Sequence, residues 1–369
     1  MQGVLHTRNT TAMKKNLILF NPSSGQNRSI NYKKQLEAAL DKKNVLHELV
    51  VTESEEHLRS LVKKHLSKKN VSQWQSVSAA GGDSTFTILI NEMVLAKASL
   101  PAGIIPLGSS DDIARELGIY SIDDAVSAIC ACRFQKMDLG KISGRPSGKT
   151  TGRENFTYYF PGQANVGIGV FTNLYVARFQ KKFPGQDDTN PAGMAEKCLS
   201  RLFKKNQTVA GILGMYQAFK KKAIPSSFTI GYKELSSSKK SSKIIVIEDE
   251  FVSILFSKIR FWATGRLFLP EAKIHDGRIH LLMIRKCGFS RTLQIMLGAG
   301  RGRHIDQKEV QYVSSDKFQL TSKRSFMIQV DGDIIRKPGK ENQKSKEIEF
   351  TSITVEALPG RINVLTGQV

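Results

Sequence analysis

Hydrophobic positions in the first third of the chain follow a regular order. Short apolar runs, typical of buried strands, alternate with longer stretches whose apolar residues recur at helical spacing. Turn-forming residues follow the strand-like runs. This alternation predicts an α/β fold with a doubly wound, mostly parallel sheet covered by helices on both faces, in which ligands bind at the carboxyl ends of the strands. The predicted strands span residues 16–20, 45–51, 77–80 and 102–106, and the predicted helices span 30–41, 53–69, 86–96 and 111–117.

The pattern changes after Asp138. A stretch rich in Gly, Ser, Lys and Arg (143–154) is typical of an exposed loop, and β-rich runs separated by turn signals follow it. One helical segment interrupts them between residues 192 and 222. These runs predict a second, β-rich, antiparallel and sandwich-like domain. They span residues 156–160, 227–232, 243–247, 251–256, 278–284, 326–330 and 348–355.

The two patterns predict two domains. The α/β domain spans residues 14–138 and the β-rich domain spans residues 139–349, while the segment 350–369 could return to the first domain. Residues 1–13 are polar and patternless, which predicts a disordered tail. Met13 is the expected initiator, because the first strand begins directly after it.

Composition excludes several classes of protein. With 40% hydrophobic residues the chain is not a low-complexity disordered protein. No apolar run approaches the roughly 20 residues of a membrane-spanning helix, and the start lacks the apolar core of a secretory signal. The cysteines are too few for a disulfide scaffold and lack zinc-site spacing: Cys130, Cys132, Cys198 and Cys287. We therefore expect a cytoplasmic chain with reduced thiols.

The chain carries a large excess of positive charge. Lys and Arg number 55 against 33 Asp and Glu, which gives a net charge of +22 and a pI near 9.8. Such a surface favours anionic lipid, nucleic acid or phosphate-bearing substrates. Nine cations lie between Lys181 and Lys222, and six lie between Arg278 and Arg303.

The basic segment 194–219 is amphipathic. This pattern predicts either reversible docking on an anionic membrane surface or a helix that packs on its own domain and leaves a basic face in solvent. No nucleic-acid-binding motif is present, so no nucleic-acid partner is predicted. The sequence leaves open whether the chain forms a homodimer.

Four loops carry residues suited to phosphate chemistry. Two glycines before a helix let the backbone approach a phosphate, and the helix N-terminus presents free N–H groups to an anion. An Asp in such a turn can hold a metal ion against phosphate oxygens. Taken singly, the loops at Gly81 and Val330 are better explained as ordinary turns, and the loop at Pro106 is equally well explained as an ordinary capped helix. The loops are Asn21-Pro22-Ser23-Ser24-Gly25, Gly81-Gly82-Asp83-Ser84-Thr85, Pro106-Leu107-Gly108-Ser109-Ser110-Asp111-Asp112, and Val330-Asp331-Gly332-Asp333.

The order of these loops along the chain resembles the catalytic superfamily of diacylglycerol kinases, particularly bacterial soluble lipid kinases related to diacylglycerol and sphingosine kinases. The resemblance runs from about residue 14 to the end. Further matching elements are Ala114 and Arg115, Met137-Asp138-Leu139-Gly140, Leu269-Pro270 with Ala272, and Asp276-Gly277. The resemblance implies an ATP-dependent lipid kinase that transfers the γ-phosphoryl group to a lipid hydroxyl, with Mg²⁺ as cofactor.

The resemblance also implies a role for individual residues. Asp331 matches the family's proposed general base, Asp83 would help organise Mg²⁺, and Asp333 occupies the position of a nearby family acid. Asp276 matches a region that binds a structural Mg²⁺ in some members. The residues that would bind nucleotide are Asn21, Ser24, Gly25, Gly81, Gly82, Thr85, Gly108, Ser109 and Asp112.

The motifs depart from the family pattern at several positions: Thr87 and Ile88 replace the usual Asn and Glu, Gln26 replaces a common cation, and two further changes lie in turns. Ser84 stands where the family has a third glycine, and a left-handed conformation there would cost Ser more than Gly. Asp111 adds a negative charge where Asn is typical. Two alternatives to an active lipid kinase therefore stay open: a catalytically impaired pseudokinase of the same fold, and a small-molecule kinase resembling NAD kinase.

Overall fold

The structure is a computed structural model. It describes residues 14–24, 29–147, 155–182, 207–220, 227–234, 243–337 and 346–367. Contacts divide the chain into two compact units. Unit 1 comprises Met1–Ser109, Leu117–Gln135 and Asn363–Val369, and unit 2 comprises Ser110–Glu116 and Lys136–Ile362. The chain passes from unit 1 to the long segment of unit 2 between Gln135 and Lys136, three residues before the predicted boundary. The segment Asn363–Val369 belongs to unit 1.

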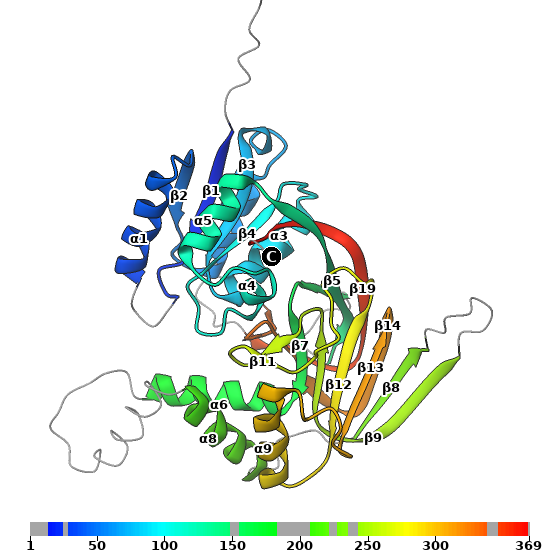
Figure 1. The fold of residues 1–369 in the computed structure, drawn as a ribbon. Coiled ribbons are helices and arrows are strands. Elements are labelled where there is room, and N and C mark those ends of the chain that lie inside the picture. Colours follow the sequence, from blue (N-terminus) through cyan, green and yellow to red (C-terminus); the bar gives the residue numbers. More distant parts are fainter. Residues whose placement is uncertain are drawn as a thin grey trace, which may run out of the picture. The chain divides into compact units, whose positions relative to one another are not determined.

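Unit 1 is built on a parallel sheet of β1 (Lys15–Phe20), β2 (His47–Val51), β3 (Trp74–Gly81) and β4 (Ala102–Pro106). The strand order is β2–β1–β3–β4 (Figure 1). The end of β19 (Glu349–Leu365) adds to β4, with Val364 opposite Ala102. The central strands β1 and β3 are buried along nearly their whole length, as expected for strands covered on both faces.

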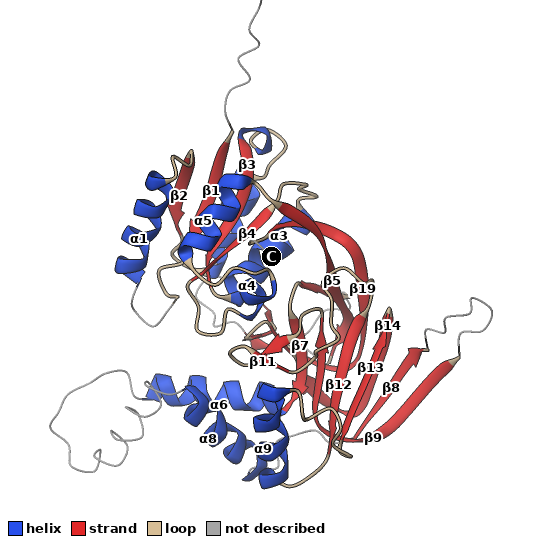
Figure 2. Ribbon diagram, viewed as in Figure 1, coloured by secondary structure: helices blue, strands red, loops and turns tan. Residues whose placement is uncertain are grey.

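Helices cover both faces of this sheet. Helix α1 (Ser29–Lys42) packs with α5 (Ile122–Ala131) on one face, and α2 (Glu55–His65) packs with α3 (Asp83–Leu95) on the other (Figure 2). A short 3-10 turn, η1 (Val71–Gln73), precedes β3. Helix α3 is buried at almost every position, because its sequence is apolar around its circumference.

Unit 2 contains a β-sandwich in which β9 (Ile244–Ser257) is shared by two sheets. The first half of β9 pairs with β8 (Ser227–Lys233), and its second half pairs with β7 (Gln163–Gly167) and β12 (Ile279–Arg285). The other strands are β5 (Phe134–Pro146), β6 (Phe156–Phe160), β13 (Val310–Ser315), β14 (Lys317–Met327), β15 (Gln329–Val330) and β16 (Asp333–Ile334). Two short ribbons complete it: β10 (Phe261–Trp262) with β11 (Arg266–Leu267), and β17 (Arg336–Lys337) with β18 (Lys346–Glu347).

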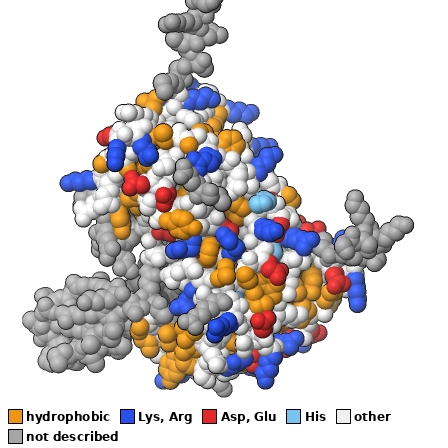
Figure 3. All heavy atoms as spheres, viewed as in Figure 1, with side chains coloured by type: hydrophobic (Ala, Val, Ile, Leu, Met, Phe, Trp, Pro, Cys, Tyr) orange, Lys and Arg blue, Asp and Glu red, His pale blue; other side chains and the backbone are white. Residues whose placement is uncertain are grey.

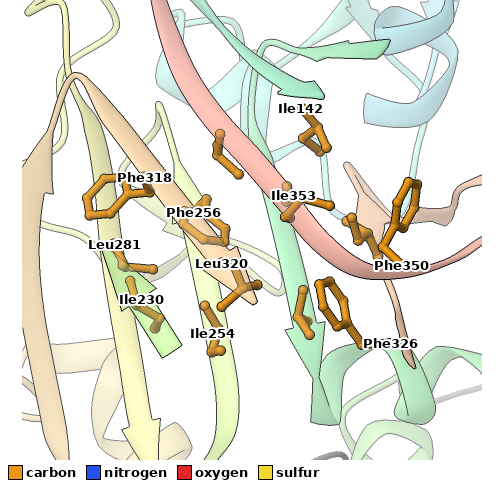
Figure 4. Close-up of a cluster of buried hydrophobic side chains, with 14 of the residues drawn as sticks. Ile142, Ile230, Ile254, Phe256, Leu281, Phe318, Leu320, Phe326, Phe350 and Ile353 are labelled. Atoms are coloured by element: carbon orange, nitrogen blue, oxygen red, sulfur yellow. The ribbon is translucent and has the colours of Figure 1, made fainter. Parts of the chain in front are cut away.

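The core of unit 2 lies between these sheets. Aromatic and aliphatic side chains from β5, β8, β9, β12, β14 and β19 meet there and are almost fully buried (Figure 4). The labelled side chains are Ile142, Ile230, Ile254, Phe256, Leu281, Phe318, Leu320, Phe326, Phe350 and Ile353.

Helices also belong to unit 2: α4 (Asp112–Glu116), α6 (Ile168–Lys182), α8 (Gln207–Lys220) and α9 (Phe289–Gly298), followed by η3 (Ala299–Arg301). Helix α8 packs on α6, where a Cβ at Gly214 would lie 2.9 Å from the carbonyl oxygen of Thr172. It also contacts α9 through the rings of Tyr216 and Phe219 against Phe289. The described part of the basic segment therefore packs on its own unit; residues 183–206 and 221–226 lie outside the described residues.

The predicted fold class is confirmed: an α/β unit with a largely parallel sheet, and a second, antiparallel β-sandwich. Some predictions within it were wrong. Residues 143–146 were expected to begin an exposed loop, but they belong to strand β5, because Ser143 and Gly144 pair with β6. The runs 243–247 and 251–256 form the single strand β9, because the acidic residues 248–250 pair with β8 instead of forming a turn. Among the described helices, none is both long enough and apolar enough to cross a membrane.

Candidate functional site

Three of the predicted loops meet at the carboxyl ends of strands in unit 1. Asn21, directly after β1, donates from its Nδ2 to the Thr85 hydroxyl oxygen (3.0 Å), and its backbone N–H donates to the Ala80 carbonyl (2.9 Å). After β4, the Leu107 N–H donates to the Gly81 carbonyl (3.1 Å). The loops after β1, β3 and β4 are therefore held together at the start of helix α3.

The two glycines of the middle loop are required by close contacts. A Cβ at Gly81 would lie 2.6 Å from the Thr85 hydroxyl oxygen, and a Cβ at Gly82 would lie 3.3 Å from the Gly108 Cα. Gly82 is the N-cap of α3 and provides no side-chain cap, so the first turn of the helix presents its N–H groups. This arrangement of backbone and helix N-terminus suits a phosphate group.

Ser84 does not carry the strain expected from the family pattern. It lies in the first turn of α3, and its φ is not positive. The left-handed residue is instead Asp111, with φ of 48°, in the loop after β4. Asp and Asn tolerate this conformation better than other non-glycine residues. Both departures are therefore compatible with the local backbone.

Asp83 is the acid beside the phosphate-compatible turn, in the first turn of α3. Mg²⁺ is usually held by one or two carboxylates together with substrate phosphates, so this residue fits the predicted role. Among the described residues no group of three or more His, Cys, Asp or Glu side chains could hold a metal ion without such help. Ser24 and Ser109 lie in the loops after β1 and β4; Gly25 lies outside the described residues.

We expect Gly81→Ala to lower the free energy of unfolding by about 1–3 kcal/mol, because the added methyl group overlaps the Thr85 side chain and must displace it. Displacement of Thr85 also removes the acceptor of the Asn21 amide, so ATP binding should weaken. Urea unfolding and equilibrium ATP binding measure the two effects.

Gly211→Ala is the matched control, since a Cβ there meets nothing within 4 Å and alanine favours the helix. Unchanged stability and ATP affinity in Gly81→Ala would contradict a rigid Gly81–Thr85 contact.

Asp331, the predicted general base, lies in unit 2 at the tip of a two-residue hairpin. Val330 and Asp333 are the paired residues, and Asp331 (φ 43°) and Gly332 (φ 96°) form the turn. The Asp331 carboxylate accepts a hydrogen bond from the Gln163 N–H (2.6 Å), and its own N–H donates to the Gln163 carbonyl (3.0 Å). The side chain is 4% exposed. The hairpin therefore holds one buried, hydrogen-bonded carboxylate in a defined position.

A polar layer supports this hairpin. Gln329 accepts from the Asn165 amide (2.8 Å) and donates to the Gly332 carbonyl (3.0 Å), which also accepts from Asn173 of α6 (3.1 Å). Opposite the carboxylate, a Cβ at Gly162 would lie 2.2 Å from Asp331 Oδ1. Only glycine leaves room for the carboxylate in this position.

The other predicted site residues make contacts of their own within unit 2. Asp112 begins α4 in unit 2, where its carboxylate accepts from the Gly265 N–H (2.6 Å). Asp333 is exposed on β16. Asp276 belongs to an ion-pair cluster with Lys258 (2.9 Å) and His280 (2.7 Å).

Some residues of the site were not predicted. Gly162, Gln163 and Asn165 lie near position 165 and contact a hairpin about 170 positions later. The Pro-Gly pair after β6 was a readable turn signal, but nothing local indicates its distant partner. Lys258 follows the apolar run 251–256, and nothing in the local sequence indicates its role.

Two family models match parts of the chain. Residues 15–142 match the family described as "Diacylglycerol kinase catalytic domain", and residues 245–366 match the "YegS C-terminal NAD kinase beta sandwich-like domain".

Similar curated proteins are lipid kinases by name. A diacylglycerol kinase of Bacillus subtilis (strain 168) is 22% identical over 87% of this chain and 90% of that protein. A diacylglycerol kinase of Staphylococcus haemolyticus is 23% identical over 70% of this chain, which spans 64% of that relative's length. Sphingosine kinase 1 of Caenorhabditis elegans is 21% identical over 86% of this chain and 77% of its own length.

A crystal structure of a diacylglycerol kinase from Bacillus anthracis strain Sterne superposes with a TM-score of 0.59 and 14% identity. It covers 97% of this chain and 98% of that one. At this identity the likeness establishes the fold.

Proposed function

Because the chain belongs to the diacylglycerol kinase catalytic-domain superfamily, we propose that it is an ATP-dependent lipid kinase. It transfers the γ-phosphoryl group of ATP to a hydroxyl of diacylglycerol or a related lipid. The observation that carries the proposal is the junction of three loops at the N-terminus of α3, held by the Asn21–Thr85 hydrogen bond.

The proposed division of labour follows the chemistry of phosphoryl transfer, which depends on positioning and charge neutralisation. The loops of unit 1 hold the nucleotide phosphates through backbone N–H groups. Asp83 helps to hold Mg²⁺, which when bound neutralises charge on the phosphates. Asp331 accepts the proton of the lipid hydroxyl as that oxygen attacks phosphorus, and ADP leaves.

A membrane surface is the proposed place of action, since the acceptor lipid resides there. The net charge of +22 supports attraction to anionic lipid, although on the face drawn in Figure 3 the described cations are scattered among neutral and acidic side chains. Of the residues between Lys181 and Lys222, 183–206 and 221–222 lie outside the described residues. The proposed attraction to anionic lipid therefore rests on the net charge of the whole chain.

Radiolabelled ATP tests the proposal. The purified protein is incubated with Mg²⁺ and either diacylglycerol, monoacylglycerol, sphingosine, ceramide or phosphatidylglycerol in vesicles, or with soluble NAD. We expect label in a lipid, and more label when the vesicles are anionic and the salt concentration is low.

Label in NAD alone would instead favour a small-molecule kinase, a reading that the second family match keeps open. No label in any acceptor, together with no ATP binding, would leave a pseudokinase. Equal labelling in anionic and zwitterionic vesicles would contradict attraction by charge.

A further inference from the structure

A fully buried lysine lies at the centre of an oxygen cluster in unit 2. The Lys258 ammonium donates to Asp138 Oδ2 (3.0 Å), to Asp276 Oδ1 (2.9 Å) and to the carbonyl oxygen of Arg278. Its side chain has no exposed surface. The three oxygens come from β5 and from the turn before β12, so one positive charge joins separate parts of unit 2.

The oxygens are oriented toward this point by further hydrogen bonds. Asp138 accepts from the Gly360 N–H (2.8 Å) with Oδ1 and from the Gly277 N–H (2.7 Å) with Oδ2. Asp276 Oδ2 accepts from His280 Nε2 (2.7 Å). Burial of the Asp276 carboxyl would raise its pKa, but hydrogen bonds from His280 and Lys258 outweigh burial and hold that pKa well below its usual range. Asp276 is therefore negatively charged at neutral pH.

Two carboxylates and a backbone carbonyl are the ligands that a hard divalent cation takes in proteins. The family resemblance implies a structural Mg²⁺ in this region, but the residues here do not fit one. An Mg²⁺ ion binds oxygen at about 2.0–2.1 Å. An ion at that distance from Asp276 Oδ1 would stand against the ammonium that already contacts the same oxygen, and the two positive charges would repel each other.

We propose that Lys258 Nζ is the resident cation of unit 2 and replaces a structural divalent ion there. The ammonium offsets the negative charge of the buried Asp138 and the partly buried Asp276, and it joins β5 to the turn at Asp276 and Gly277. It follows that unit 2 keeps its fold without divalent cations, and that any Mg²⁺ requirement of the chain belongs to nucleotide binding. The inference does not depend on which substrate the chain phosphorylates.

The first test compares thermal unfolding of the wild-type protein, without nucleotide, in excess EDTA and in millimolar Mg²⁺ or Ca²⁺. We expect the same melting temperature in all three conditions, because no structural divalent ion is present to be removed. A melting temperature lowered by EDTA would overturn the proposal.

The second test is Lys258→Met, which keeps an unbranched side chain, ends it one atom earlier and removes its charge. We expect the melting temperature to fall by about 10 °C, since one buried and one partly buried carboxylate lose their cation. We also expect millimolar Ca²⁺ or Mg²⁺ to restore part of that loss, because the vacated oxygens then suit a divalent ion. If neither Ca²⁺ nor Mg²⁺ raises the melting temperature of Lys258→Met, the proposal that the ammonium occupies the place of a divalent ion is overturned.

Lys317→Met is the matched control. Lys317 is 60% exposed and forms a looser ion pair with Glu356 (3.7 Å). The same substitution there should shift the melting temperature by less than about 3 °C and create no response to divalent ions. If Lys258→Met fails to fold in every buffer, the EDTA comparison on the wild-type protein still decides the proposal.

Discussion

Asp331→Asn should abolish phosphoryl transfer while ATP binding is retained. A carboxylate acting as general base contributes about 10²–10⁴-fold to the rate, and an amide cannot accept the proton. The substitution should leave the hairpin intact for two reasons. The Asn side-chain oxygen can still accept from the Gln163 N–H, and Asn tolerates the left-handed conformation found at position 331. The measurements are kcat with the best acceptor lipid and the Kd for ATP.

Asp306→Asn serves as the control, because it makes the same chemical change at an exposed position of unit 2. It should retain wild-type kcat. If Asp331→Asn turns over at more than about a tenth of the wild-type rate, Asp331 is not the base. If it loses ATP binding as well, the loss of transfer has another cause.

The second large effect is expected from Gly162→Ala, a change that leaves the base itself in place. The new methyl group would overlap Asp331 Oδ1 at 2.2 Å and crowd Ile113 at 3.0 Å. The carboxylate must rotate away and lose the Gln163 hydrogen bond. Since a displacement of about 1 Å can cost about 10²-fold in rate, we expect kcat to fall by that factor while the KM for ATP stays near its wild-type value.

Steady-state kinetics with ATP and lipid varied separately measure this split between kcat and KM. Gly231→Ala provides the comparison, because a Cβ at Gly231 meets nothing within 4 Å. A proportionate loss of stability and of every kinetic constant in Gly162→Ala would instead indicate general damage to unit 2. An unchanged kcat would show that the carboxylate of Asp331 is not held against Gly162, which would contradict the argument.

Local sequence patterns predicted the four parallel strands of the first unit and its helices α1, α2 and α3, but not α5. The predicted strand 102–106 matches β4, and the predicted helix 30–41 matches α1 within one residue at each end. Strand 77–80 was predicted too short, because the polar residues Gln75 and Ser76 interrupt the apolar run although both belong to β3. Strongly periodic segments bury a continuous face, so their sequence alone indicates their structure.

Patterns were less informative for the second unit. Strand β7 and helix α6 adjoin each other at Gly167 and Ile168 without a separating loop, and neither was predicted. The apolar runs on both sides of the acidic segment 248–250 looked like separate strands, yet they form one strand that changes partners. These elements depend on pairing between strands that are far apart in the sequence, and a local pattern of residues does not predict such pairing.

The sequence alone thus predicted which loops suit a phosphate group, because turn chemistry is a local property. The order of the motifs along the chain gave the family resemblance, which in turn implies Asp331 as the base. The sequence also established the excess of positive charge. Only the tertiary structure joined Asn21 to Thr85, placed Gly162 against Asp331, and put Lys258 between Asp138 and Asp276. Each of these contacts depends on the register of strands or loops far apart in the chain. The local sequence around Lys258 therefore did not predict that this residue would be a buried cation.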